Sequence, residues 1–382
     1  MDARNFKCPK AGRVVKTATG YTAFIPAPLP PKLVYDGELV LRLSTADTAL
    51  SELSGVGRLL PNPNLLISPL VRREAVLSSR IEGTRATLSD VLLDEAAAPG
   101  GGSREADLRE VRNYVVALEY GVARLGALPL SLRLVCELHA KLMAGVRGNH
   151  ATPGEFRRSQ NWIGPAGSSP ESAPYVPPPP EELMACLGQW ELFLHERERL
   201  PVLIQCALMH EQFEAIHPFL DGNGRIGRLL VTLFLMERGR LRQPLLYLSD
   251  FIEAHRLDYY DLLQRVRTHG DWNAWLRFFL TGVAEIAEDA ARRATRLLEL
   301  REQWRRQFAG KAYVAALLDQ LFVNPYITVA TAAATLKSST PTASRALGLL
   351  EAAGILREIS GRKWGRIWLA GTILGAIQEQ SA

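Results

Sequence analysis

Apolar residues recur at helical spacing along most of the chain, and two such stretches flank a short polar segment at residues 217–228. The first stretch has apolar residues separated by three, four and three positions, namely Cys206, Met209, Phe213 and Ile216. This period predicts a buried helix over about residues 202–216. Pro218 disfavours helical backbone at His217, so we expect the helix to end there.

The apolar period resumes beyond the polar segment, at Ile226, Leu229, Leu233 and Met236. It predicts a second helix that begins at about Gly224 or Arg225. The segment HPFLDGNGRIGR is therefore expected to connect two helices and to lie at the N-terminus of the second. Such an end carries unpaired backbone N–H groups and a partial positive charge, so it attracts phosphate oxygens.

The residues of this segment favour phosphate chemistry. Gly222 and Gly224 let the backbone approach a ligand closely. Arg225 and Arg228 are three residues apart, so they share one helical face and can bind outer phosphate oxygens. Taken singly, DGNG is typical of a turn and the two arginines of a solvated face.

Two further residues favour group transfer. The Asp221 carboxylate beside phosphates is explained by a Mg²⁺ ion bound between them. His217 has a side chain that can accept a proton from a hydroxyl near neutral pH. Alone, this histidine could also be an ordinary helix cap, but the combination favours a phosphate site with its own base.

The segment also resembles the signature of the Fic family, HxFx(D/E)GNGRxxR, at every specified position. The resemblance implies transfer of AMP from ATP to a protein hydroxyl, with pyrophosphate as the leaving group. It assigns these roles: His217 as base, Asp221 as Mg²⁺ ligand, Gly222, Asn223 and Gly224 as phosphate cradle, Arg225 and Arg228 as contacts of the β and γ phosphates, and Phe219 as core anchor.

Upstream, residues 1 to about 60 begin with a Pro-rich stretch, GYTAFIPAPLPPKL, which we expect to be extended chain on the surface. A helix is predicted over about residues 68–83, with Ser68 as N-cap, Pro69 in its first turn and Gly83 at its end. A short helix capped by Thr87 follows, and then a break at AAAPGGGS.

Ser78 and Glu82 lie four residues apart on one face of the predicted helix. The sequence SSRIEG matches the pattern (S/T)xxxE(G/N), which Fic proteins use as an inhibitory helix. The resemblance implies that Glu82 pairs with Arg228 and crowds the γ phosphate, so that ATP binds unproductively. Otherwise the two residues are an ordinary helix end.

Helical spacing predicts further helices at 106–125, 131–143, about 182–199 and 282–308. Between them, residues 154–182 favour two short extended segments in a loose hairpin. By the family resemblance this hairpin is a flap that binds an extended segment of the target protein through main-chain pairing; a plain surface loop is the alternative. The resemblance also makes His255, Tyr259 and Tyr260 candidates for adenine or ribose contacts, with His255 standing where related sequences have Asn.

Residues 311–382 predict three helices and a two-stranded wing, the order of a winged helix-turn-helix. Seven Lys or Arg against four Asp or Glu give this part a net charge of +3. Arg362, Lys363 and Arg366 on the wing could contact DNA phosphates. Winged helices also bind proteins or form dimers, so both kinds of partner stay open.

Composition sets the remaining expectations. With 382 residues, 47% of them hydrophobic and 22% charged, the chain is expected to form two or three globular domains. It has no apolar run of membrane-spanning length and no signal-peptide core at its start, so a cytoplasmic protein is expected. The four cysteines form no CxxC pair, which argues against a zinc site or a disulfide framework.

Together these features predict a mainly α-helical, Fic-type core with a β-hairpin flap and a C-terminal winged helix-turn-helix. The expected organisation is an N-terminal segment (1–100), a core (101–281), a linker helix (282–310) and a C-terminal domain (311–382). The expected function is an ATP- and Mg²⁺-dependent, autoinhibited protein adenylyltransferase that forms a homodimer. Alternatives are transfer of another group, removal of AMP, or a DNA-binding regulator whose core senses nucleotide.

Overall fold

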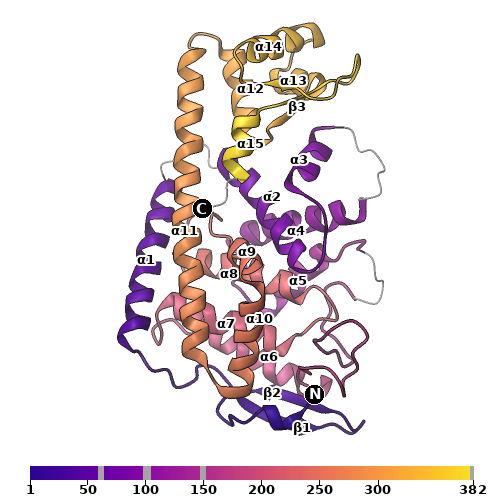
Figure 1. Cartoon of the computed structure of the whole chain (residues 1–382), viewed down its shortest axis with the longest axis vertical. Helices are drawn as coiled ribbons and strands as arrows, with labels where there is room; N and C mark the ends of the chain where they lie inside the picture. The colour runs from indigo at the N-terminus through magenta and orange to yellow at the C-terminus, as the bar shows by residue number, and fades with distance from the viewer. Residues whose placement is uncertain (59–63, 98–104, 147–151, 379–382) are drawn as a thin grey trace.

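The computed structural model describes residues 1–58, 64–97, 105–146 and 152–378, and it is mainly helical, as predicted (Figure 1). The predicted break at AAAPGGGS lies largely outside the described residues. The helices up to the long vertical helix of Figure 1 are α1 (Gly37–Arg58), α2 (Asn64–Ile81), α3 (Leu88–Ala96), α4 (Glu105–Arg124), α5 (Leu132–Leu142), α6 (Pro180–His195), α7 (Val202–Ile216), α8 (Asn223–Glu237), α9 (Ser249–Ala254), α10 (Arg256–His269) and α11 (Trp272–Gln307).

Helix α7 is the centre of the larger core, and its predicted bounds are confirmed. All of its residues from Leu203 to Ile216 are buried. The indole N–H groups of Trp190 and Trp275 donate to the backbone carbonyls of Met209 and Ala207, so two other helices are fastened to it from different sides. Trp275 and Phe279, in the aromatic run that opens α11, are buried in the same core.

Helix α2 begins at Asn64, four residues before the predicted N-cap, and Pro69 lies inside it rather than in its first turn. The prediction of Ser68 as N-cap is therefore wrong. Proline at this position removes one backbone hydrogen bond, whereas the earlier start lets Leu65 bury its side chain against the C-terminal part of the chain. The other end agrees with the sequence, since Gly83 has a φ of +103°.

The Pro-rich stretch near the N-terminus is not simply extended surface chain, so this prediction is wrong. Strands β1 (Gly12–Lys16) and β2 (Thr22–Pro26) form an antiparallel hairpin. Phe24 is buried against Tyr175, and its backbone N–H donates to the carbonyl of Val176 at 2.9 Å. The hairpin therefore supports the 154–182 segment from below in Figure 1.

That segment contains the predicted loose hairpin in reduced form. A single antiparallel bridge joins Ile163 and Tyr175, and the rest consists of turns and extended backbone. The segment is attached to α7, since the Tyr175 hydroxyl donates to the carbonyl of Ala215 at 2.7 Å.

The C-terminal part packs around the upper half of α11. It comprises α12 (Ala312–Val323), β3 (Tyr326–Thr328), α13 (Val329–Leu336), α14 (Thr340–Ala352), β4 (Arg357–Glu358), β5 (Ile367–Leu369) and α15 (Gly371–Gln378), with the strands in the order β3-β5-β4. These include the three helices and the two-stranded hairpin expected there. The linker helix expected at 282–310 is the second half of α11, which is continuous from Trp272.

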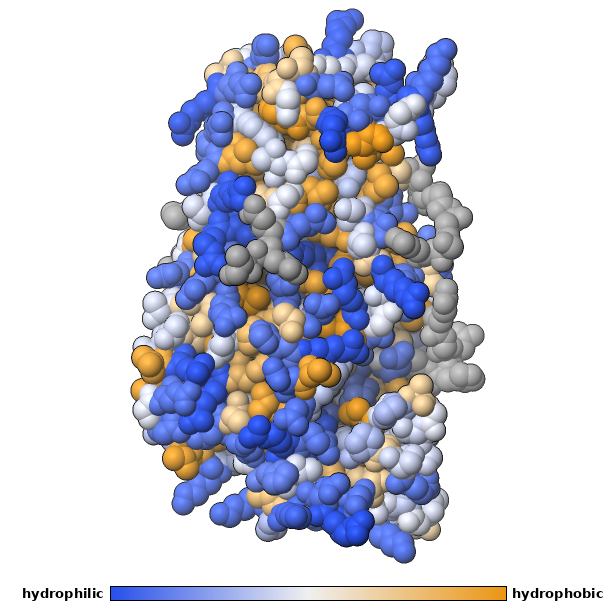
Figure 2. Space-filling model, viewed as in Figure 1, coloured by the Kyte–Doolittle hydropathy of each residue, from blue (hydrophilic) through white to orange (hydrophobic). Residues whose placement is uncertain are grey.

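The second core is shared between the two parts of the chain. Leu65 of α2 and Leu88 and Leu92 of α3 are buried with α11, α12 and the small sheet. None of the helices in the described part of the chain has the length and apolar composition needed to cross a membrane. Hydrophilic and hydrophobic residues are interspersed over the face in Figure 2.

Candidate active site

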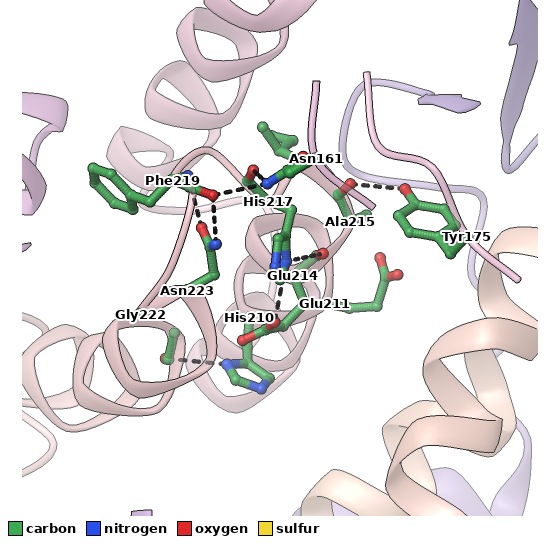
Figure 3. Close-up of polar contacts among 12 residues, drawn as sticks. Asn161, Tyr175, His210, Glu211, Glu214, Ala215, His217, Phe219, Gly222 and Asn223 are labelled. Atoms are coloured by element: carbon green, nitrogen blue, oxygen red, sulfur yellow. Dashed lines mark hydrogen bonds and ion pairs between the residues drawn. The ribbon is translucent and has the colours of Figure 1, made fainter. Parts of the chain in front are cut away.

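The loop between α7 and α8 has the backbone geometry that its sequence predicts. His217 ends α7 in the left-handed region, with a φ of +50°, and Gly222 precedes α8 with a φ of +80°. The Asn223 side chain holds the loop from inside: its Oδ1 accepts the Phe219 N–H and its Nδ2 donates to the Phe219 carbonyl, both at 2.8 Å (Figure 3). Only the backbone of Asn223 is left for a phosphate.

Two residues of the 154–182 segment hold the loop from outside. Arg157 is buried, and its Nε donates to the His217 carbonyl at 2.9 Å. Asn161 Nδ2 donates to the carbonyls of Phe219 at 2.8 Å and His217 at 3.2 Å. Burial lowers the pKa of Arg157 to about 10, so the guanidinium stays charged at neutral pH. Sequence reasoning missed both residues, because nothing local in EFRRSQNWIG indicates these distant partners.

A third support comes from His139 on α5. Its ring stacks on Phe219, with centroids 3.7 Å apart. Nδ1 accepts the Gly154 N–H, so Nε2 carries the proton and donates to the Asp221 carbonyl at 3.0 Å. Burial lowers the pKa of His139 to about 4, which keeps the ring neutral. Its inward position on an amphipathic helix was its only sequence signal, and that signal also fits an ordinary core residue.

The His217 ring is poised as a base. Its Nδ1 lies 3.3 Å from the Glu214 carbonyl, which can only accept, so Nδ1 carries the proton and Nε2 keeps its lone pair (Figure 3). Burial, with the nearby charges of Arg267 and Arg157, lowers the pKa of His217 to about 3. The imidazole is therefore neutral at physiological pH, as general base catalysis requires.

Arg228 is bound to the helix that the sequence marked as inhibitory. Its Nε donates to Ser78 Oγ at 2.9 Å, and its Nη2 donates to the Ser78 carbonyl at 2.9 Å and to Glu82 Oε1 at 2.7 Å. The Arg228 side chain is only 2% exposed, and that of Glu82 is 36% exposed. Burial disfavours the charge of Glu82, but Arg228 more than compensates, so the pKa of Glu82 is lowered.

Glu82 lies over the N-terminus of α8. A Cβ atom on Gly224 would be 2.3 Å from Glu82 Oε1, so this glycine allows the carboxylate to approach the helix end. Arg225 is also engaged, with Nη1 3.1 Å from Glu110 and Nη2 3.6 Å from Asp221. Both signature arginines thus face carboxylates at the place where the sequence predicts phosphates.

None of the contacts of His255 described here involves a residue of the signature loop. His255 joins α9 and α10, its side chain is 46% exposed, and its ring contacts Phe251 and Phe278. Of its two aromatic neighbours in sequence, Tyr259 is buried and its hydroxyl donates to His210 Nε2 at 3.0 Å. Tyr260 is 42% exposed, so it is the more accessible of the two tyrosines for a base or ribose contact.

Asp221 is the only acidic residue of the loop, and its side chain is 56% exposed. Within the described residues no group of three or more His, Cys, Asp or Glu side chains could hold a metal. One exposed carboxylate next to a phosphate site nevertheless fits Mg²⁺, which commonly takes one protein carboxylate together with phosphate oxygens and water.

Two family models match the chain. The Fic/DOC family N-terminal model covers residues 40–123, including the helix with Ser78 and Glu82, and the Fic/DOC family model covers residues 129–235, including the signature. Among curated proteins, the chain is 34% identical over 156 residues to a protein adenylyltransferase Fic of Aedes aegypti, covering 39% of this chain and 27% of that protein. It is 31% identical over 206 residues to one of Drosophila grimshawi, covering 52% and 38%.

The chain thus spans less than two-fifths of the length of these relatives. Solved structures share the fold. A Fic family protein from Desulfovibrio desulfuricans G20 superposes with a TM-score of 0.57 at 19% identity, covering 90% of this chain and 98% of that one. Fic-1 (aa134–508) from C. elegans gives 0.51 at 22%, covering 69% and 73%. With both family models matched and the signature loop built as described, the chain belongs to the Fic/DOC family.

Proposed function

We propose that this protein is an adenylyltransferase that transfers AMP from ATP to a Ser, Thr or Tyr hydroxyl of a protein. The observation that carries the proposal is the neutral His217, whose Nε2 keeps its lone pair, next to a helix N-terminus built to receive phosphate. The printed names of the curated relatives support the same activity.

In the proposed reaction the target hydroxyl oxygen attacks the α phosphorus of ATP. His217 Nε2 takes the hydroxyl proton, the bond from the α phosphorus to the bridging oxygen breaks, and pyrophosphate leaves. The backbone N–H groups at Gly222–Gly224 would hold phosphate oxygens, and Arg225 and Arg228 would bind the outer phosphates. Catalysis then rests on positioning and on preorganised charge.

Asp221 would hold Mg²⁺ together with the phosphates. When bound there, the ion neutralises charge that develops on the leaving pyrophosphate. The protein's own contribution is to keep the Asp221 backbone in place, which His139 does through its bond to the Asp221 carbonyl.

The contact between Glu82 and Arg228 supports an autoinhibited enzyme. While Glu82 occupies the guanidinium, the γ phosphate lacks its partner, and the carboxylate repels it from the end of α8. ATP would then bind in an unproductive pose. Because both residues belong to one chain, this inhibition needs no separate protein.

The test is labelling of a cell lysate with ATP radioactive at the α phosphate, using the full-length Glu82→Gly protein. His217→Ala in that background is expected to abolish labelling while ATP binding persists, and His195→Ala, at an exposed histidine of α6, serves as matched control. Transfer of AMP by the His217→Ala variant would refute the mechanism. Label from ATP radioactive at the γ phosphate, or from UTP, would instead indicate another group.

A second candidate function rests on the hairpin between β4 and β5. Trp364 is 83% exposed at its tip, between exposed Arg362 and Lys363 on one side and Arg366 on the other. Cations interleaved with an aromatic ring suit a nucleic acid, which offers phosphates and stacking faces. We propose that the protein binds duplex DNA with an affinity that falls as the salt concentration rises. The double variant Arg362→Ala, Trp364→Ala is expected to abolish this binding. Unchanged DNA binding by that variant would refute this second function.

A homodimer and a cytoplasmic location stay predictions. Light scattering coupled to gel filtration measures the first, since a dimer has twice the 42.2 kDa of one chain. Fractionation of the producing cells measures the second.

A further inference from the structure

A buried carboxyl group lies behind the proposed base and has no role in the reaction described so far. Glu214 is 6% exposed, and its Oε2 lies 3.9 Å from His217 Nδ1 (Figure 3). Its Oε1 is buried without a hydrogen-bond partner. A buried polar atom without a hydrogen-bond partner lowers the stability of the fold, so its presence calls for an explanation.

The fold makes room for this carboxyl group. A Cβ atom on Gly227 of α8 would come within 2.4 Å of Glu214 Oε1 and 3.3 Å of His210 Cε1. The signature tolerates any residue at position 227, but in this chain only glycine lets α7 and α8 approach with the Glu214 side chain between them. Gly227 therefore shapes the space behind the base.

Charged groups of its own helix and of neighbouring segments act on Glu214. Burial is the largest influence and raises its pKa to about 7. Arg228 of α8 and Arg267 of α10 favour its ionised form, whereas Glu82, just after α2, and Glu211 of its own helix disfavour it. Of these, Glu211 is paired with Arg267 at 3.3 Å, and Glu82 with Arg228 at 2.7 Å.

We infer that Glu214 is a positioning residue for the transfer of AMP, because its backbone carbonyl fixes the tautomer of His217 and its carboxylate stabilises the imidazolium that forms. This inference rests on the proposed function. In the step itself, the hydroxyl proton goes to Nε2, the Nδ1 proton stays on the ring, and the new positive charge lies beside the Glu214 carboxylate. Proton and charge therefore balance without another reactant.

Ionisation of Glu214 should make the rate of AMP transfer depend on pH. Protonated Glu214 cannot stabilise the imidazolium, so kcat should rise as pH increases through about 7, the pKa to which burial raises Glu214. His217 itself cannot produce this rise, since its pKa of about 3 leaves it neutral over the whole range.

The experiment uses full-length Glu82→Gly protein, in which the inhibitory carboxylate is absent, with and without Glu214→Gln. Glutamine keeps the size and the backbone carbonyl but removes the charge. Loss of Glu82 removes a charge that raises the pKa of Glu214, so the rise in kcat should lie at a lower pH in this background. On replacing Glu214 by Gln we expect kcat at pH 8 to fall on the order of 10- to 100-fold, the rise to disappear, and KM for ATP to change by less than about twofold. Glu285→Gln, at an exposed position of α11, is the matched control. A kcat profile that keeps the same rise after Glu214→Gln would overturn the inference.

A second variant displaces the carboxyl group without removing it. Gly227→Ala puts a methyl carbon 2.4 Å from Glu214 Oε1, so this side chain must move. We expect a partial loss of kcat with the thermal midpoint of unfolding within a few degrees of the parent. Full activity with an unchanged pH profile would contradict the role of the carboxylate.

A spectroscopic measurement separates this inference from the proposed function. In protein with ¹⁵N-labelled histidine, the His217 ring signals should shift with a midpoint near pH 7 as Glu214 ionises, and this shift should vanish in Glu214→Gln. If the Glu82→Gly protein transfers no AMP but the shift is seen, the proposed function fails and the coupling of the two side chains stands. If AMP is transferred but the shift is absent, the inference fails alone.

Discussion

Replacing Glu82 by glycine tests the inhibitory contact most directly. The carboxylate contacts Arg228 Nη2 at 2.7 Å, where Coulomb's law gives about 6 kcal/mol at an effective dielectric constant of 20 and about 1.5 kcal/mol in water. Because 36% of the Glu82 side chain is exposed, solvent screening brings the net value toward the range of a hydrogen bond to a charged group, about 1.5–3 kcal/mol.

If the γ phosphate must displace this contact before transfer, that free energy adds to the barrier. Its removal is then expected to raise the rate of AMP transfer by about 10- to 150-fold. The assay is the initial rate of label transfer from α-labelled ATP to protein at saturating ATP, at pH 7.5. At this pH Glu82 is ionised, because Arg228 outweighs the effect of burial and lowers its pKa, so the ion pair is intact in the parent protein.

The control separates the effect of losing the carboxylate from the effect of placing a glycine near the end of α2. Arg80→Gly introduces the same flexible residue two positions earlier on the same helix, at an exposed side chain. It should lower stability by up to about 1 kcal/mol without raising the rate. A Glu82→Gly rate within twofold of the parent, or an equal increase in Arg80→Gly, would refute the inhibitory role of the ion pair.

Three further predictions follow from the same geometry. Gly224→Ala should displace Glu82 and also obstruct the phosphates, so its transfer rate should stay at or below that of the parent even though the ion pair is weakened; a rise in rate would contradict this. Burial raises the pKa of Glu74 to about 7, so its contribution to stability is present below pH 4.5 and is lost as pH rises through 7. In denaturant unfolding, the free energy of unfolding of the parent should therefore fall between pH 5 and 8. In Glu74→Gln this fall should be smaller by on the order of 1–3 kcal/mol. His139→Leu should lose both loop hydrogen bonds and lower kcat at least tenfold, with the thermal midpoint reporting any loss of fold.

Local patterns predicted the helices around the loop because each of these helices has a full apolar period. Helix α7 is bounded by Pro218 and α8 by two glycines, and such residues act within one or two positions. The hairpin of β1 and β2 was missed because its strands are short and its burial depends on Tyr175, about 150 residues away. The start of α2 was misplaced for the same reason, since Leu65 is buried by the C-terminal part.

Within the site, the residues of the signature could be found from their order alone, whereas their supports could not. Arg157 and Asn161 act by donating to backbone carbonyls, a role that any residue with N–H donors at the right place can fill. In the sequence, Glu214 is one of several polar residues between the apolar positions of α7, and nothing sets it apart from them. Only the approach of α8 to α7 shows that its side chain is enclosed behind His217.

The way in which α2 is held decides what must move for activation. Its middle is fixed, because buried Glu74 accepts bonds from Tyr114 at 2.9 Å and Ser249 at 2.6 Å. Glu82, in contrast, lies just past the last helical residue, where Gly83 turns the chain away. Moving the whole helix would break buried hydrogen bonds, whereas rotating one half-exposed side chain breaks a single ion pair. Under the proposed inhibition, we therefore expect a triphosphate to compete with Glu82 locally, and activation to require no displacement of α2.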